Sequence, residues 1–148
     1  MQLDTYDFGS ADFTIECWYF PTVATLYNYL FSANYAIQVY HASGTLKPAF
    51  AISHTDYTSY DANKTSVDSA VLNSWNHIAF VRHGTTWTLY LNGKSVAEAL
   101  GVNITLPAPT VVGSLGAFST GSWFFNGFID KFRVTKGVAR YTQGFIPA

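Results

Sequence analysis

Hydrophobic and polar side chains alternate with a period of two through the middle of the chain, which is the side-chain spacing of a β-strand. The alternation runs through residues 75–82 and again through residues 87–92, and a short polar connection at 83–86 separates the two runs. This arrangement predicts a β-hairpin. An Asn-Gly pair at 92–93 tolerates the positive φ angles of a type I′ turn, so a third strand is expected over residues 94–100.

Shorter runs rich in aromatic and β-branched residues predict further strands on both sides of this meander. They lie at residues 12–20, 29–33, 35–41, 46–54 and 65–70, from 111, and at 123–135. The last run needs a β-bulge near Asp130 and Lys131, because its apolar residues cannot all face one side at strict alternation. Residues 136–141 are expected to form one turn of helix. About ten short strands with frequent turns indicate a β-sandwich or barrel.

Composition agrees with an all-β fold. The 148 residues are enough for one domain with its own core, and 49% of them are hydrophobic and 18% aromatic. Only 11% are charged, against about 25% in an average soluble domain, which excludes a disordered chain. Cys17 lies within the apolar run 13–20, so we expect a buried small side chain rather than a reactive thiol.

The charge pattern argues against two classes of partner. The formal net charge is −1 and the basic residues are scattered, so no nucleic-acid partner is expected. No apolar stretch approaches the roughly 20 residues of a membrane-spanning helix, so no membrane insertion is expected either.

The sequence offers little for catalysis. Glycosidases carry two carboxylates at catalytic distance, and on a strand this needs acidic residues two positions apart. No such pair occurs, and Glu16 and Glu98 are distant in sequence. The four histidines are not clustered at metal-ligand spacing, and His77 is interpreted as a hydrogen-bonded packing residue. Asp130 is expected to tie down the bulge. A glycoside hydrolase therefore stays a remote alternative, and we expect no enzyme.

Four segments together resemble the laminin G-like, concanavalin A-like jelly roll. They are residues 7–21, 74–94, 111–114 and 125–141, in the order that the family has them. The resemblance implies an antiparallel jelly-roll β-sandwich that occupies residues 1–148 as a single domain. Segment 125–141 looks most like the version of this domain in bacteriophage and other viral structural proteins.

The first strand of the family is represented here only by Gln2 and Leu3. This suggests that the strand is truncated or that a neighbouring chain supplies it. An uncovered edge of this kind would be a place for another chain to add a strand.

The loop at 55–64 is the longest polar segment, and its tyrosines stand beside carboxylate and amide groups. We expect a ligand-binding rim here, in which Tyr57, Tyr60 and Trp123 stack on a sugar and neighbouring polar groups bind its hydroxyls. The alternative that these aromatic residues only close the ends of the sandwich stays open. The full predicted site is Asn34, Tyr35, Asp56, Tyr57, Tyr60, Asp61, Asn63 and Trp123.

Calcium is a known ligand of laminin G-like domains, so the resemblance raises the question of a metal. By approximate correspondence one family ligand falls near Asn34, and the other falls in the loop 114–125, which contains no acidic residue. A hard dication prefers carboxylates, so we expect no calcium at that place and no other cofactor. A different calcium site formed by Asp56, Asp61 and Asp68 is the alternative.

Two functions are compatible with these features. The first is a non-enzymatic binding module of a phage-like virion structural protein, such as a tail fibre, spike or decoration protein, that recognises a glycan or a host-surface receptor. The second is a purely structural virion domain that packs against other virion proteins or against itself as a homo-oligomer. Both readings place the protein on the surface of a virion.

Overall fold

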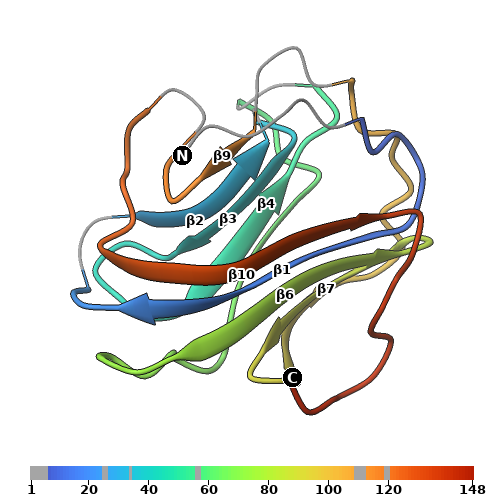
Figure 1. Cartoon of the computed structure of the whole chain (residues 1–148). Helices are drawn as coiled ribbons and strands as arrows, with labels where there is room; N and C mark the ends of the chain where they lie inside the picture. Colours follow the sequence, from blue (N-terminus) through green and yellow to red (C-terminus); the bar gives the residue numbers. More distant parts are fainter. Residues whose placement is uncertain (1–6, 25–26, 34, 56–57, 109–112, 119–120) are drawn as a thin grey trace.

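The computed structural model describes residues 7–24, 27–33, 35–55, 58–108, 113–118 and 121–148. These residues form two five-stranded antiparallel sheets that face each other (Figure 1). The strands are β1 (Phe13–Pro21), β2 (Asn28–Ala33), β3 (Ile37–His41), β4 (Pro48–Ile52), β5 (Ala62–Thr65), β6 (Asn76–His83), β7 (Thr86–Leu91), β8 (Lys94–Ala99), β9 (Ser114–Leu115) and β10 (Gly127–Lys136). We name each sheet after its central strand: the β6 sheet has the order β10-β1-β6-β7-β8, and the β3 sheet the order β5-β4-β3-β2-β9. The predicted all-β sandwich is confirmed.

The predicted central meander is also confirmed. β6, β7 and β8 pair in sequence, with only residues 84–85 between the first two strands. Asn92 and Gly93 have φ angles of 50° and 81°, as a type I′ turn requires. The meander supplies three of the five strands of the β6 sheet.

Residues that alternate along the strands fill the space between the sheets. On β1, Phe13, Ile15, Cys17 and Tyr19 are each at most 4% exposed and belong to the main core. Burial raises the pKa of the Cys17 thiol to about 12, so this side chain packs as a small hydrophobe, as expected.

The bulge predicted in the last strand is present. Glu16 pairs with Arg133 but Trp18 pairs with Asp130, so β10 contains one extra residue between these two pairs. Lys131 has a φ angle of 51°, and its backbone N–H donates to the Asp130 carboxylate at 2.8 Å. Asp130 therefore has the structural role that was expected for it.

Three predicted elements are wrong. The strand expected at 65–70 lies earlier, at β5, because Ser66 uses its hydroxyl in a local turn with Asp68 that ends the strand. The last strand begins only at Gly127 and not at 123. Residues 136–141 form no helix, because their backbone bonds to the neighbouring β1 region, as in the 2.9 Å bond from Arg140 N–H to the Thr14 hydroxyl.

The two outer faces of the sandwich differ. The segment 137–148 follows β10 and runs along the β6 sheet, where Ala139, Tyr141 and Phe145 pack on that sheet's outer side (Figure 1). The outer side of the β3 sheet instead carries a separate cluster of aromatic rings. No helix capable of crossing a membrane occurs in the described part of the chain. Gln2, Leu3 and residues 111–112 lie outside the described residues.

Candidate functional site

The strand register places a set of polar and aromatic residues on the outer face of the β3 sheet. Ile37 and Val39 point into the core. Because side chains alternate along a strand, Gln38 and Tyr40 point outward. Tyr40 pairs with Tyr29 on β2, which brings their side chains together on the same face. We call this surface the aromatic face and define it as Tyr27, Tyr29, Tyr35, Gln38, Tyr40, Tyr60, Asn63, Phe118 and Trp123.

Four rings form the inner part of the aromatic face. Tyr29 and Tyr40 stack with ring centroids 5.1 Å apart and an interplanar angle of 20°. The ring of Phe118 meets Tyr29 edge-on at 5.2 Å, and Tyr35 lies 5.3 Å from Phe118. Such offset and edge-on pairs are the favoured arrangements of aromatic side chains, so the cluster is rigid.

Two further rings extend this cluster toward solvent. Tyr27 lies 4.9 Å from Trp123 and 6.2 Å from Tyr40. Tyr27 and Trp123 both have left-handed backbones, with φ angles of 44° and 56°, although neither is glycine. Strain of this kind persists only where the surroundings enforce it, and it is often found at binding sites. The two rings are 38% and 45% exposed, so a ligand can reach both.

Hydrogen bonds fix the polar groups of the aromatic face. The Tyr29 hydroxyl donates to the Gln38 side-chain oxygen at 2.9 Å, and the Gln38 amide lies 3.5 Å from the Tyr60 hydroxyl. The Tyr40 hydroxyl donates to the Asn63 side-chain oxygen at 3.0 Å. Burial raises the pKa of both Tyr29 and Tyr40, so their hydroxyls stay protonated donors at neutral pH. Gln38, Tyr29 and Tyr40 are at most 9% exposed, so their hydrogen bonds fix the base of the face, while Tyr60 and Asn63 present uncharged polar groups to solvent.

The structure brings together four residues of the predicted site. Tyr35, Tyr60, Asn63 and Trp123 all belong to the network of contacts that makes up the aromatic face. Asp61 does not: its carboxylate accepts a 2.8 Å hydrogen bond from the backbone N–H of His54 and lies 2.7 Å from the His54 ring. The other predicted residues, Asn34, Asp56 and Tyr57, lie outside the described residues.

The alternative calcium site is not formed by the two described carboxylates that were assigned to it. Asp61 is paired with His54, whereas Asp68 accepts from the Lys94 ammonium at 2.7 Å. Within the described ranges no group of three His, Cys, Asp or Glu side chains is arranged to hold a metal ion.

Five residues of the aromatic face were missed by sequence reasoning. They are Tyr27, Tyr29, Gln38, Tyr40 and Phe118. The period of two could have predicted that Gln38 and Tyr40 point outward, because they alternate with the buried Ile37 and Val39. Phe118 gave no such signal, because it reaches the cluster from an irregular segment after β9.

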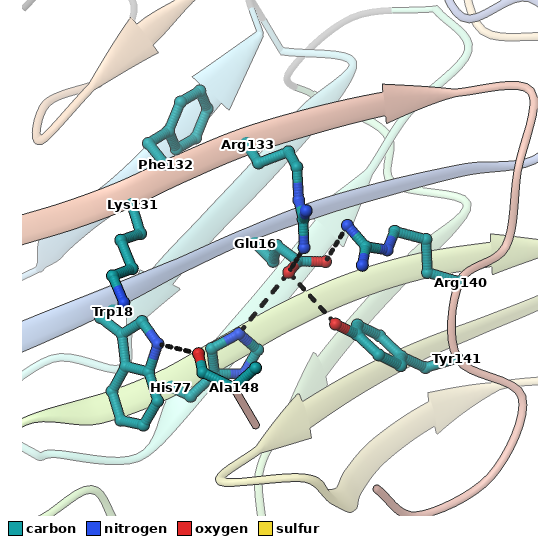
Figure 2. A pocket seen from close by; sticks show the side chains of 9 residues that line it. All are labelled: Glu16, Trp18, His77, Lys131, Phe132, Arg133, Arg140, Tyr141 and Ala148. Carbon is teal, nitrogen blue, oxygen red and sulfur yellow. Dashed lines mark hydrogen bonds and ion pairs between the residues drawn. The ribbon is translucent and has the colours of Figure 1, made fainter. Parts of the chain in front are cut away.

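Glu16 is the other polar feature that the sequence did not single out. It lies on the outer face of the β6 sheet, where Arg133 donates to its Oε1 at 2.5 Å and the Tyr141 hydroxyl donates at 3.2 Å (Figure 2). Arg140 Nη1 is 3.9 Å from Oε2, and His77 Nε2 is 3.8 Å from Oε1. The sequence signal was a lone acid in an apolar strand, but its partners Arg133 and Tyr141 lie more than 100 residues away.

The environment of Glu16 keeps it ionised. Burial by itself would raise the pKa of this carboxyl, but the nearby His77 ring, the hydrogen bond from Arg133 and the charges of Arg133 and Arg140 lower it to about 2. A general acid needs the opposite shift, so Glu16 is not suited to protonate a leaving group near neutral pH. His77 is 3% exposed and lies edge-on to Trp18 at 5.2 Å, which confirms that it packs in the interior, but its ring Nδ1 makes no hydrogen bond within the described residues.

The chain belongs to the concanavalin A-like lectin/glucanases superfamily, because a laminin G-type model of that superfamily matches residues 1–140. A search of curated protein sequences finds no significant match.

Solved structures share the fold at low sequence identity. The CBM40 module of the Ruminococcus gnavus IT-sialidase, bound to α2,3-sialyllactose, is 16% identical with a TM-score of 0.75, over 95% of this chain and 89% of that one. Domain 4 of AbnA, a GH43 extracellular arabinanase from Geobacillus stearothermophilus, in complex with arabinotriose, is 16% identical with a TM-score of 0.68, over 93% and 66%. A candidate carbohydrate binding protein of Bacteroides ovatus is 17% identical with a TM-score of 0.76, over 95% of this chain and 42% of that one.

At these identities the similarity shows a shared fold and not a shared ligand. The chain spans less than half the length of the Bacteroides ovatus protein.

Proposed function

We propose that this domain is a non-enzymatic glycan-binding module and that the aromatic face is its binding surface. The observation that carries the proposal is the combination of exposed rings with fixed polar groups on one face. Tyr60 and Trp123 are 41% and 45% exposed, and both are tied into the network of Tyr29, Gln38 and Tyr40.

This combination matches the chemistry of sugars. A pyranose ring has an apolar face of C–H groups, which stacks on aromatic side chains, and hydroxyls around its edge, which bond to amides and hydroxyls. The stacking and hydrogen-bonding groups of the face are already held in place by one another, so little side-chain entropy would be lost on binding. The face is also uncharged, which favours a neutral sugar residue as the ligand.

The comparisons support a carbohydrate ligand in general, neutral or acidic. Two of the structures that share this fold hold an oligosaccharide, sialyllactose in one and arabinotriose in the other. The proposal that the module is not an enzyme is supported by Glu16, whose pKa of about 2 is wrong for a general acid.

A glycan-array screen of the purified domain tests the proposal, with and without calcium. The variants Trp123→Ala and Tyr60→Ala should each weaken binding about tenfold or more, because a stacked ring contributes on the order of 1–2 kcal/mol. Phe128→Ala is the matched control, since Phe128 is 62% exposed but lies on β10 in the other sheet. The proposal fails if the folded domain binds no glycan, or if Phe128→Ala lowers affinity as much as Trp123→Ala does.

The wider setting is a phage-like virion protein in which this module serves host attachment. The support for it is the resemblance of segment 125–141 to domains of viral structural proteins. The virion surface is then the expected location, with other virion proteins as neighbours. Comparing the parent open reading frame and its genomic neighbours with known virion genes tests this setting.

A purely structural role is the second candidate, and exposed apolar side chains favour it. Phe124 and Phe128 are 63% and 62% exposed and could be covered by another copy or by a neighbouring virion protein. Sedimentation equilibrium distinguishes the two: a stable homo-oligomer that binds no glycan supports the structural role, and a monomer that binds glycan excludes it.

A further inference from the structure

The outer face of the β6 sheet contains a hollow of a different chemical character from the aromatic face. A cavity of about 420 Å³ lies between β1, β10 and the C-terminal segment. Lys131 and Arg133 reach it from β10, Arg140 comes from the C-terminal segment, and Glu16 lies at its base (Figure 2). We call this hollow the arginine pocket.

The arginine pocket carries an excess of positive charge. Its lining contains three cationic side chains, Lys131, Arg133 and Arg140, against one acidic side chain, that of Glu16, and Ala148 also lines it. The side chain of Glu16 is 6% exposed, whereas those of Arg133 and Arg140 are 49% and 31% exposed. The negative charge is therefore buried and the positive charge faces outward, so an entering ligand meets the guanidinium groups first.

Glu16 also positions these cations before any ligand arrives. Its Oε1 accepts from Arg133, while its buried Oε2 makes no hydrogen bond within the described residues and faces Arg140 at 3.9 Å. A guanidinium has five N–H donors, so the single bond from Arg133 to Oε1 leaves most of its donor capacity for a ligand. Two arginines held beside a buried carboxylate are preorganised for a planar or tetrahedral oxyanion.

An apolar surface continues from the charged end. A second hollow of about 300 Å³ shares Trp18, Lys131 and Ala148 with the arginine pocket and extends to Trp75 and Asp130. The Trp18 indole N–H donates to the carbonyl of Ala148 at 3.1 Å, which fixes the ring. Phe20 packs edge-on to Trp75 at 5.6 Å and supports it from the side. The result is a groove with the two arginines at one end and the indole rings at the other, where Asp130 and Lys131 place one charge of each sign.

We propose that this groove is a second binding site, for an acidic saccharide whose carboxylate or sulfate is held by Arg133, Arg140 and Lys131 while a sugar ring packs against Trp18. A free inorganic anion would use only the cationic end, and a neutral sugar would leave that end without a partner. Only a ligand with both an anionic group and a flat apolar ring face uses the whole groove. This proposal does not depend on the aromatic face, which lies on the other sheet.

Titrations of the ¹⁵N-labelled domain test the proposal. The probes are a galacturonate trisaccharide, a sulfated galactose trisaccharide, the neutral galactose trisaccharide and inorganic sulfate. At least one acidic saccharide should shift the indole resonances of Trp18 and Trp75, with an affinity that falls as salt is added, because the attraction is partly between exposed charges. The neutral trisaccharide should bind at least tenfold more weakly. Comparing the carboxylated with the sulfated probe identifies which anion the pocket prefers.

Variants locate the site. Lys131→Gln and Arg140→Gln should each lower the affinity for the acidic saccharide severalfold, and the two substitutions together should lower it at least tenfold. Lys136→Gln removes an exposed lysine of the same strand that does not line the groove, and should change nothing. The doubly substituted Glu16→Gln, Arg133→Gln protein removes both members of this ion pair together, so neither is left without the other, and it should bind the acidic saccharide severalfold more weakly.

Four results would overturn the proposal. They are no binding of any acidic probe at millimolar concentration, binding that survives substitution of Lys131 and Arg140, inorganic sulfate binding as tightly as the saccharides, and loss of binding in Trp123→Ala. The last result would assign the acidic saccharide to the aromatic face instead. Loss of neutral-glycan binding in Trp123→Ala would leave this proposal untouched, so the two sites succeed or fail separately.

Discussion

The two outer faces of this sandwich shield their aromatic side chains from water in different ways. On both sheets the residues that alternate with the core include aromatic side chains, which are costly to leave in water. On the β6 sheet the chain itself covers part of this surface, because Tyr141 and Phe145 pack on Val81 and Tyr90. On the β3 sheet the rings pack against one another. The comparison indicates that the uncovered β3 sheet offers a broad aromatic surface, whereas on the β6 sheet the covering segment leaves only the groove beside it.

The largest expected effect comes from Gly93→Ala, which tests how firmly the C-terminal segment holds to the β6 sheet. A Cβ at this position would lie 1.7 Å from the carbonyl oxygen of Phe145, and the φ angle of 81° already disfavours alanine. The segment must move away, and the 2.9 Å bond from Phe145 N–H to the Gly93 carbonyl is lost. We expect the free energy of unfolding to fall by about 3 kcal/mol or more.

Gly44→Ala is the matched control for that substitution. Gly44 has a similar φ angle of 70°, but a Cβ there would meet nothing within 4 Å. It should therefore cost only the backbone strain, about 1–2 kcal/mol. Chemical denaturation measures both values, and hydrogen exchange of the backbone amides of residues 139–145 reports whether the segment has detached. Equal losses in the two variants would show that the segment contributes little to stability.

Acid provides the second way to separate the two faces, because Glu16 belongs only to the β6 sheet. Its pKa is lowered from 4.5 to about 2 in the folded protein, so the unfolded chain binds the proton more readily. The stabilisation is fully present above pH 4.5 and is lost as the pH falls toward 2. It is of order 3–4 kcal/mol, because the pKa falls from 4.5 to about 2 and one pKa unit corresponds to about 1.4 kcal/mol.

The variant Glu16→Gln should flatten the stability profile in that pH window, measured by urea denaturation at a series of pH values. The matched control is Glu98→Gln: Glu98 is exposed and accepts only a 3.3 Å hydrogen bond from Thr88. A profile in Glu16→Gln as steep as in the parent protein would mean that other carboxylates dominate acid unfolding.

Most of the fold was predictable because the information is local. The period of two and the Asn-Gly turn at 92–93 predicted β6, β7 and β8, since each strand pairs with its neighbour in sequence. The bulge at Lys131 was likewise visible as a break in alternation. The error at 136–141 depends on hydrogen bonds to distant residues, such as Thr14, that no local pattern shows. The error at 65–70 has a local cause, because the turn between Ser66 and Asp68 was not recognised.

The candidate site was predicted only in part for the same reason. Tyr60 and Trp123 stood out as aromatic residues in loops, but the surface between them is formed by strands whose outward faces meet only after folding. Glu16 and Arg140 are 124 positions apart and come together through the return of the C-terminal segment over β1. Their contact follows from the topology of the fold. The family resemblance implied this topology but did not indicate the contact.

Asn63→Ala has the smallest expected effect on stability. Measuring this effect shows whether the aromatic face is an open binding surface or a second hydrophobic core. Asn63 is exposed, and its side-chain oxygen accepts from the Tyr40 hydroxyl at 3.0 Å. Water can replace this acceptor if the aromatic face is open, so the free energy of unfolding should fall by less than about 1 kcal/mol. Affinity for the glycan ligand should still fall roughly threefold to tenfold, because the Tyr40 hydroxyl loses its fixed orientation.

Asn103→Ala, at an exposed asparagine in the connection after β8, is the control and should leave both quantities unchanged. Denaturation and glycan titration on the same protein samples measure the two effects together. A stability loss above about 2 kcal/mol in Asn63→Ala would mean that the Tyr40 hydroxyl is left buried without a partner. The rings of the β3 sheet would then be a second core that needs no ligand, and the contrast between the two faces would be one of packing rather than of function.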